Sequence, residues 1–165
     1  CGATMSFDTE TRVNESSSEE LKLWLRLNAC NNLIQNELRN VLRSQFQTTL
    51  PRYELMAQLS NAPQGLRMGE LSERLMVSNG NITTITMQLE REDLIERILN
   101  REDRRSTFIR LTPKGKKLLT KMVKAYDKCL SESFAKFSEA NAKKLQKSLA
   151  DFKSAIMTQV ETPAE

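Results

Sequence analysis

Residues 68–92 have the sequence MGELSERLMVSNGNITTITMQLERE, and this stretch decides the fold. It holds two short helical patterns, over residues 68–75 and from about residue 79 to 92. Ser78 is a good N-cap for the second helix. Two helices joined by so tight a turn are typical of a helix-turn-helix. The apolar residues of the second helix share one face, the side that must be buried: Ile82, Ile85 and Leu89.

A two-stranded hairpin is predicted directly after this motif. Residues 94–99 are a strand candidate, residues 107–111 alternate as a second strand does, and a charged turn at residues 100–105 joins them. A hairpin that follows a helix-turn-helix is a wing. The chain is therefore predicted to be mainly α with a small β-hairpin, in a winged helix-turn-helix. Thr112 is placed to cap the next helix, with Pro113 at its first position.

Long helices are predicted on both sides of this lobe. Ser18 begins an amphipathic helix that ends near Phe46. Thr49 is placed to cap a second, shorter helix. A third begins at Pro113 and runs to about residue 134. The last is marked by apolar residues at steps of four, three and four: Leu145, Leu149, Phe152 and Ile156.

These patterns divide the chain into three kinds of segment. Residues 1–18 are polar and form a flexible arm, in which Cys1-Gly2-Ala3-Thr4 before Met5 is expected to be a cloning remnant. Residues 48–111 form the winged helix-turn-helix lobe. Residues 19–47 and 112–158 form a separate helical region.

Four stretches resemble the MarR (multiple antibiotic resistance regulator) family: residues 50–56, 69–75, 77–83 and 94–115. The most specific part is Asp103-Arg104-Arg105, followed six residues later by Leu111-Thr112 and then Gly115. The resemblance covers about residues 20–158. It implies a homodimer that grips a pseudo-palindromic operator in double-stranded DNA, with the helical region as the dimerisation region and no cofactor. It also implies a repressor that is released by a small-molecule effector bound near the junction with the DNA-binding lobes.

The second helix of the motif carries side chains suited to reading the major groove. Most are short donors or acceptors that would not hold the helix away from the bases, while Gln88 can reach an adenine edge and Arg91 a phosphate or guanine. The alternative is that they only cap the helix or face water. The residues expected to contact DNA here are Ser78, Asn79, Asn81, Thr83, Thr84, Gln88 and Arg91.

The charged turn carries Arg101, Arg104 and Arg105. A planar guanidinium on a thin hairpin tip fits a narrow minor groove, where the potential is most negative. The resemblance implies that Arg105 is the inserted arginine and that Asp103 orients an arginine without touching DNA. The alternative is a solvated turn whose charges pair with one another.

The first two long helices carry the residues expected to bind the effector. The phrase at residues 25–30, together with Leu50-Pro51-Arg52-Tyr53, looks like a subgroup that responds to aromatic acids or their CoA thioesters. The alternative is that apolar residues at helical spacing belong to the core. The candidate effector residues are Trp24, Asn28, Asn31, Arg52, Tyr53 and Met56.

Cysteine chemistry offers another function, a redox-sensing regulator. Some members of the family sense peroxide through a cysteine early in the first helix, but its register falls at about Leu25 and not at Cys30. We therefore expect Cys30 and Cys129 to be buried, inert thiols. No two of the three cysteines stand at metal-ligand spacing, so no metal site is expected.

Composition narrows the remaining functions. The chain has no histidine, which removes His-based nucleophile pairs and His-ligated metals, and no catalytic residues are recognisable, so an enzyme is not expected. The lobe at residues 66–111 holds eight arginines and eight acids and has no net charge, whereas residues 112–165 hold eleven lysines and six acids. No apolar run approaches membrane-spanning length, and a cytoplasmic location is expected. A dimeric helical adaptor that binds protein and not DNA remains as an alternative.

Overall fold

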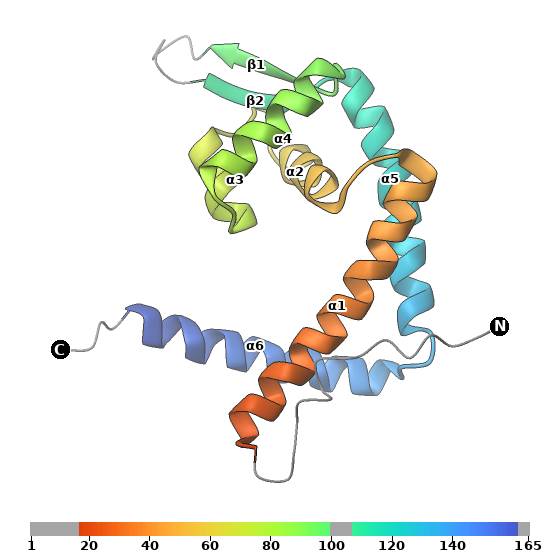
Figure 1. Cartoon of the computed structure of the whole chain (residues 1–165), viewed down its shortest axis with the longest axis vertical. Coiled ribbons are helices and arrows are strands. Elements are labelled where there is room, and N and C mark those ends of the chain that lie inside the picture. The colour runs from red at the N-terminus through yellow and green to blue at the C-terminus, as the bar shows by residue number, and fades with distance from the viewer. Residues whose placement is uncertain (1–16, 100–106, 162–165) are drawn as a thin grey trace. The chain divides into compact units, whose positions relative to one another are not determined.

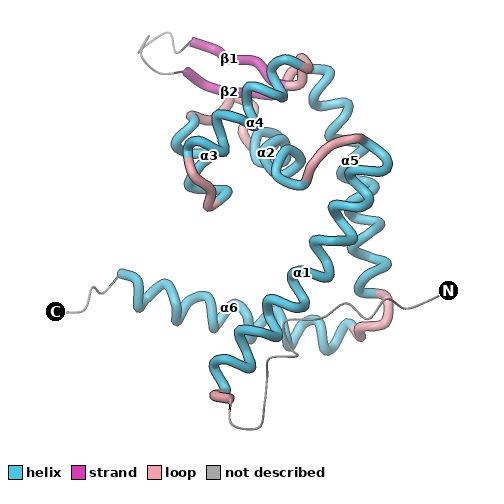
Figure 2. Tube along the Cα trace, in the orientation of Figure 1, coloured by secondary structure: helices cyan, strands magenta, loops and turns pink. Residues whose placement is uncertain are grey.

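The computed structural model describes residues 17–99 and 107–161 (Figure 1). Two compact units follow one another along the chain, one ending at Leu130 and one beginning at Ser131. Helices dominate both, and two short strands complete the first (Figure 2). The prediction of a mainly α winged helix-turn-helix is confirmed. The elements are α1 (Glu19–Phe46), α2 (Leu50–Ser60), α3 (Met68–Leu75), α4 (Asn79–Arg91), β1 (Ile95–Leu99), β2 (Thr107–Leu111), α5 (Pro113–Phe134) and α6 (Glu139–Glu161).

The helices begin where the predicted caps stand. The Oγ atoms of Ser18 and Ser78 accept hydrogen bonds from backbone N–H groups three residues ahead, at 3.3 and 3.4 Å. Thr49 holds the N-cap position of α2, but the prediction that it caps is wrong in one respect, because its side chain makes no capping hydrogen bond. The second helix of the motif ends at Arg91, and Glu92 is its C-cap.

The hairpin pairs β1 and β2 in antiparallel register, with Ile95 opposite Leu111. Leu66, between α2 and α3, adds a further bridge: its N–H donates to the carbonyl of Ile109 at 2.9 Å, and the N–H of Ile109 returns a bond at 2.8 Å. The hairpin is therefore attached to the helices by backbone hydrogen bonds as well as by packing. The turn predicted at residues 100–105 lies outside the described residues.

Thr112 fixes the junction of hairpin and helix. Its Oγ1 accepts from the N–H of Gly115 at 3.0 Å, which confirms the predicted cap of α5. The same hydroxyl donates to the carbonyl of Asp93 at 2.7 Å, just beyond α4. The backbone N–H of Thr112 donates to the carbonyl of Leu94 at 3.1 Å. One residue thus joins the end of α4, the base of the wing and the start of α5.

Two glycines allow the backbone to pass closely at this base. A Cβ on Gly115 would stand 2.0 Å from the Leu94 carbonyl oxygen. A Cβ on Gly65, whose φ of +93° already favours glycine, would stand 2.8 Å from the carbonyl oxygen of Ile109. Side chains at these positions would push the wing away from the helices.

The core of the first unit lies between these elements. It joins fully buried residues from all of them, so the inner face of α4 is fixed on α2, α3 and the wing. The apolar residues with no more than 1% of their surface exposed are Leu42, Leu55, Met56, Leu71, Ile82, Leu89, Ile109 and Met122.

Candidate nucleic-acid interface

The α3–α4 turn sets the direction of α4. Met76 ends α3 in the left-handed conformation, with φ of 53°, and the Ser72 hydroxyl donates to the carbonyl of Val77 at 2.6 Å. Behind the turn, Ile82, Thr86 and Leu89 are buried. The opposite side of α4 is therefore presented to solvent.

All seven residues predicted for this helix lie on that exposed side or at its cap. Their chemistry is less uniform than the sequence indicates. The Thr83 hydroxyl donates to the carbonyl of Asn79 at 2.9 Å, and the Thr84 hydroxyl donates to that of Gly80 at 3.1 Å. Each of these hydroxyls already donates its one hydrogen to the helix backbone, so it can only accept further hydrogen bonds.

Arg91 carries a positive charge at the end of this side. It pairs with no residue that the structure describes, whereas other arginines of the lobe have partners. Arg97 lies 3.0 Å from Glu90, and Arg110 lies 2.7 Å from Glu96. Exposed pairs of this kind contribute little to stability. Because Glu90 and Glu96 are engaged in these pairs, Arg91 is available for a phosphate or a guanine.

The predicted wing contacts are not placed by the structure. Arg101, Asp103, Arg104 and Arg105 lie outside the described residues. The strands that carry the turn are described on both sides of it, up to Leu99 and from Thr107 on.

The six predicted effector residues do not share one environment. Tyr53 and Met56 are buried in the core, whereas the Trp24 side chain is 60% exposed. Asn31 is exposed and Asn28 is half-buried. Arg52 pairs with Glu92 beyond the end of α4, and its Nε is buried without a hydrogen-bond partner among the described residues.

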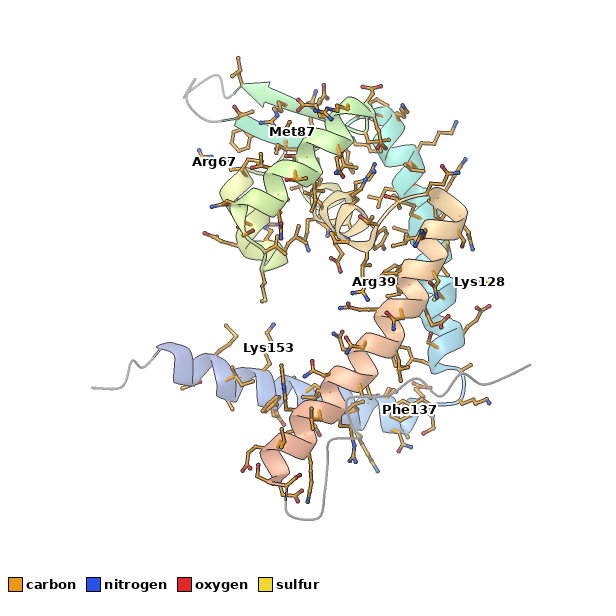
Figure 3. The ribbon with its side chains drawn as sticks, in the orientation of Figure 1. Arg39, Arg67, Met87, Lys128, Phe137 and Lys153 are labelled. Atoms are coloured by element: carbon orange, nitrogen blue, oxygen red, sulfur yellow. The ribbon has the colours of Figure 1, made fainter. Side chains whose placement is uncertain are left out.

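A groove lies instead between α1 and the N-terminal half of α4, and none of the six predicted residues lines it. Its volume is about 600 Å³. Two cationic side chains stand on its α1 wall, Arg39 and Arg43. Arg39 is held by Asn36 and Gln35, and Figure 3 shows where it leaves α1. The other walls are residues 48–51 and Val77, Asn81, Thr84 and Ile85.

The sequence could not reveal this groove, because its walls come from three separate segments. Within them Arg43 is exposed and pairs with no residue described in the structure. A guanidinium in that state beside apolar walls is suited to a carboxylate on an apolar body.

Tyr53 takes part in the packing of α2 on α5. Its ring stacks on that of Tyr126, with centroids 4.5 Å apart and planes inclined by 19°. Burial, followed by the nearby Tyr126, Asp127 and Glu54, raises the pKa of Tyr53 to about 12. Burial also raises the pKa of Tyr126. The fold therefore favours the neutral phenol.

We expect this tyrosine to make stability fall at high pH. The folded pKa lies above the unfolded value of about 10, so the contribution is complete below pH 10 and is lost as pH rises towards 12. Over this pH interval the free energy of unfolding, measured in urea, should fall by on the order of 2 kcal/mol more for the wild type than for Tyr53→Phe, which has no phenol at this position to ionise. Equal losses in both proteins would contradict the assignment.

The cysteines are placed differently from one another. Cys129 is buried, as predicted, but the prediction is wrong for Cys30, which is exposed. Leu25 and Ala29 lie on the buried side of α1, and Cys30 follows Ala29 by one residue, about 100° around the helix. At the register of the peroxide-sensing cysteine, Leu25 is buried.

Residues 17–99 and 107–161 hold neither a cluster of metal ligands nor a membrane-spanning helix. They contain no group of three or more Cys, Asp or Glu side chains placed to hold a metal ion. No helix among them is sufficiently long and apolar to span a bilayer.

Comparison with known proteins connects this lobe to one family. The family model described as "MarR family" matches residues 48–107, from the turn before α2 to the first residue of β2. The chain is 24% identical over 117 residues to the uncharacterized HTH-type transcriptional regulator YsmB of Bacillus subtilis, covering 71% of this chain and 79% of that protein. It is 27% identical over 97 residues to the transcriptional activatory protein BadR of Rhodopseudomonas palustris, covering 58% of this chain. That match spans about half of BadR, 55% of its length.

A protein of similar fold has been crystallised with DNA. Sco3205, a MarR family transcriptional regulator from Streptomyces coelicolor crystallised in complex with DNA, is similar to this chain with a TM-score of 0.76. The sequences are 20% identical, and the match covers 92% of this chain and 93% of that one. At this identity the likeness concerns the fold.

Proposed function

We propose that this chain, whose residues 48–107 match the MarR family model, is a sequence-specific DNA-binding regulator of transcription. The observation that carries this proposal is α4, whose inner face is fixed in the core. Its outer side presents Asn79, Asn81, Gln88 and Arg91, and Arg91 pairs with no described residue. Amides and guanidinium groups are the side chains that read base edges in the major groove.

Selection from a random DNA library tests this function. The full chain should enrich a pseudo-palindrome, and a fluorescence anisotropy titration should separate that site from unrelated DNA by at least about a thousandfold at physiological salt. Binding that is equally weak on every duplex and vanishes as salt is raised would contradict the proposal and favour the protein-binding adaptor.

We propose that the chain binds as a homodimer through residues 19–47 and 112–158, while residues 48–111 contact DNA. The second unit offers an apolar surface for a second copy: Leu145, Leu149, Phe152 and Ile156 of α6 are each 39–45% exposed. Apolar residues aligned along one helix at this exposure are typical of an interface. Two copies related by a twofold axis match the symmetry of a pseudo-palindrome.

The wing tip supplies a prediction that rests on the sequence. Arg105→Ala is expected to weaken operator binding strongly, about a hundredfold, because two guanidinium groups per dimer leave the minor groove. Anisotropy titration measures the loss. Unchanged thermal unfolding and an unchanged dimer mass control for folding and assembly. An affinity within threefold of the wild type would refute the role proposed for Arg105.

We propose that a small acid controls DNA binding from the groove beside α4, with an aromatic acid or its CoA thioester as the class to test. Arg43 provides there a cation that pairs with no residue in the described part of the chain, and Asn81 and Thr84 belong to both the groove wall and α4. A bound molecule would therefore contact the helix that contacts DNA. We further propose that binding releases a repressor. Because BadR is named an activatory protein, a reporter gene should be read in both directions.

A thermal-shift screen of aromatic acids and acyl-CoA thioesters tests this site. A ligand at a hundred times its Kd should stabilise the fold by about 2.7 kcal/mol, and the shift should vanish in Arg43→Ala. Arg74→Ala is the matched control, since Arg74 is also exposed but lies outside the groove. A shift that survives in Arg43→Ala but vanishes in Arg52→Ala would place the effector among the residues predicted from the sequence.

One observation favours the redox alternative, the exposed position of Cys30. Peroxide that releases DNA from the wild type but not from Cys30→Ser would establish it. Equal behaviour of the two proteins would exclude this cysteine as the switch.

A further inference from the structure

The outermost line of side chains on α4 differs from the set that the sequence emphasises. Gly80, Thr84, Met87 and Arg91 follow one another at steps of four, three and four residues, so they lie along one side of the helix. This side is opposite the buried Ile82 and Leu89. A surface laid against α4 meets this line first, and Figure 3 labels Met87 on it.

The middle of this line is apolar. Met87 is 44% exposed, and its thioether has no donor to offer. The Thr84 hydroxyl is bonded to the Gly80 carbonyl at 3.1 Å, so its γ-methyl is the end of the side chain that the helix leaves unengaged. Cationic and amide groups stand at the end and the flank, in Arg91 and Gln88.

Gly80 adds an independent indication of close approach. A Cβ at this position would meet nothing within 4 Å, and its φ is not positive, so the fold has room for a side chain. A glycine inside a helix costs up to about 1 kcal/mol relative to alanine. What the missing side chain provides is a short distance between the helix backbone and a facing surface.

We propose that this line recognises thymine through its C5 methyl group, with Met87 as the specificity-determining residue and the Thr84 methyl beside it. In the major groove thymine is marked by a methyl group, and apolar side chains read it by contact. Gln88, on the flank, has the amide that pairs with an adenine edge. Both contacts select A·T pairs, so each half-site contains a thymine facing Met87. This inference rests on the proposed DNA binding.

Deoxyuridine tests the inference without disturbing any hydrogen bond, because it differs from thymidine only in the missing methyl group. Each thymine of the selected operator is replaced in turn, and affinity is measured by anisotropy with the full chain. Burying one group of this size contributes about 0.8 kcal/mol, a factor of about four. We expect a fourfold loss at one or two thymines in each half-site, about fifteenfold when both half-sites are changed, and no change at thymines outside the site.

Protein variants assign the effect to its residue. In Met87→Ala and Met87→Gln, the operator with thymine and the operator with deoxyuridine at the position facing Met87 should be bound with equal affinity. Gln88→Ala, on the same helix, should weaken both operators but keep their ratio. If specific binding is found and no deoxyuridine changes it, or if the ratio survives in Met87→Ala, the inference is overturned while DNA binding stands. If no specific site is selected, both fail.

Discussion

Gly115→Ala is expected to destabilise the first unit by at least about 3 kcal/mol, the upper end of what overpacking costs. The added Cβ would stand 2.0 Å from the carbonyl oxygen of Leu94 and 2.9 Å from its carbon. A side chain could rotate away, but this contact is with backbone. Moving the carbonyl would also break the 3.1 Å hydrogen bond that it accepts from Thr112. For a chain of this length the melting temperature should fall by about 10 °C, measured by circular dichroism.

The matched control is Gly69→Ala in α3. Gly69 is exposed and helical, and a Cβ there would meet nothing within 4 Å. That variant should be as stable as the wild type or slightly more stable, because alanine favours the helix. If Gly115→Ala had the same melting temperature as Gly69→Ala, the close approach of α5 to the Leu94 carbonyl could not be a constraint on the fold.

The double variant Leu149→Glu/Phe152→Glu is expected to abolish the dimer and, with it, operator binding. Both side chains lie on the apolar side of α6, at 39% and 42% exposure. Two carboxylates on each copy would have to be desolvated against the same two on the other, a cost of several kcal/mol per charge. A single copy holds only one half-site, so the affinity for the full operator should fall at least about a hundredfold. Analytical ultracentrifugation measures the mass.

Ala150→Glu/Ser154→Glu is the control for charge. These positions lie on the opposite side of α6, both exposed, and add the same two carboxylates to the helix. This variant should remain a dimer and bind DNA with the wild-type affinity. A dimer that persists in the Leu149/Phe152 variant would show that the assembly is held elsewhere.

Local signals explain which parts of the fold were predictable. The bounds of α3 and β2 agree with the sequence patterns to the residue, because hydrophobic period, cap and turn all act over a few neighbours. Ser18, Ser78 and Thr112 cap as expected for the same reason. Leu66 could not be foreseen as a partner of Ile109, since a single bridging residue produces no repeating pattern of apolar residues in the sequence.

The site was predicted in outline only. Helical spacing placed the α4 residues on the exposed side, but it cannot show to which acceptor a hydroxyl donates. The hydroxyls of Thr83 and Thr84 donate to carbonyls of their own helix. It also cannot show that Arg43 and Asn81 wall one groove, because tertiary packing brings them together. Cys30 was misplaced because the helix face had to be inferred from its neighbours.

The three bonds of Thr112 have a consequence for regulation. They tie the residues just beyond α4 and the first turn of α5 to one residue, which couples the positions of the two helices. A displacement of α5 would carry both reading faces of a dimer apart or together without reshaping them. An effector acting this way would alter the centre-to-centre distance at which two half-sites fit, ordinarily one helical turn or about 34 Å of DNA, and would leave base preference unchanged.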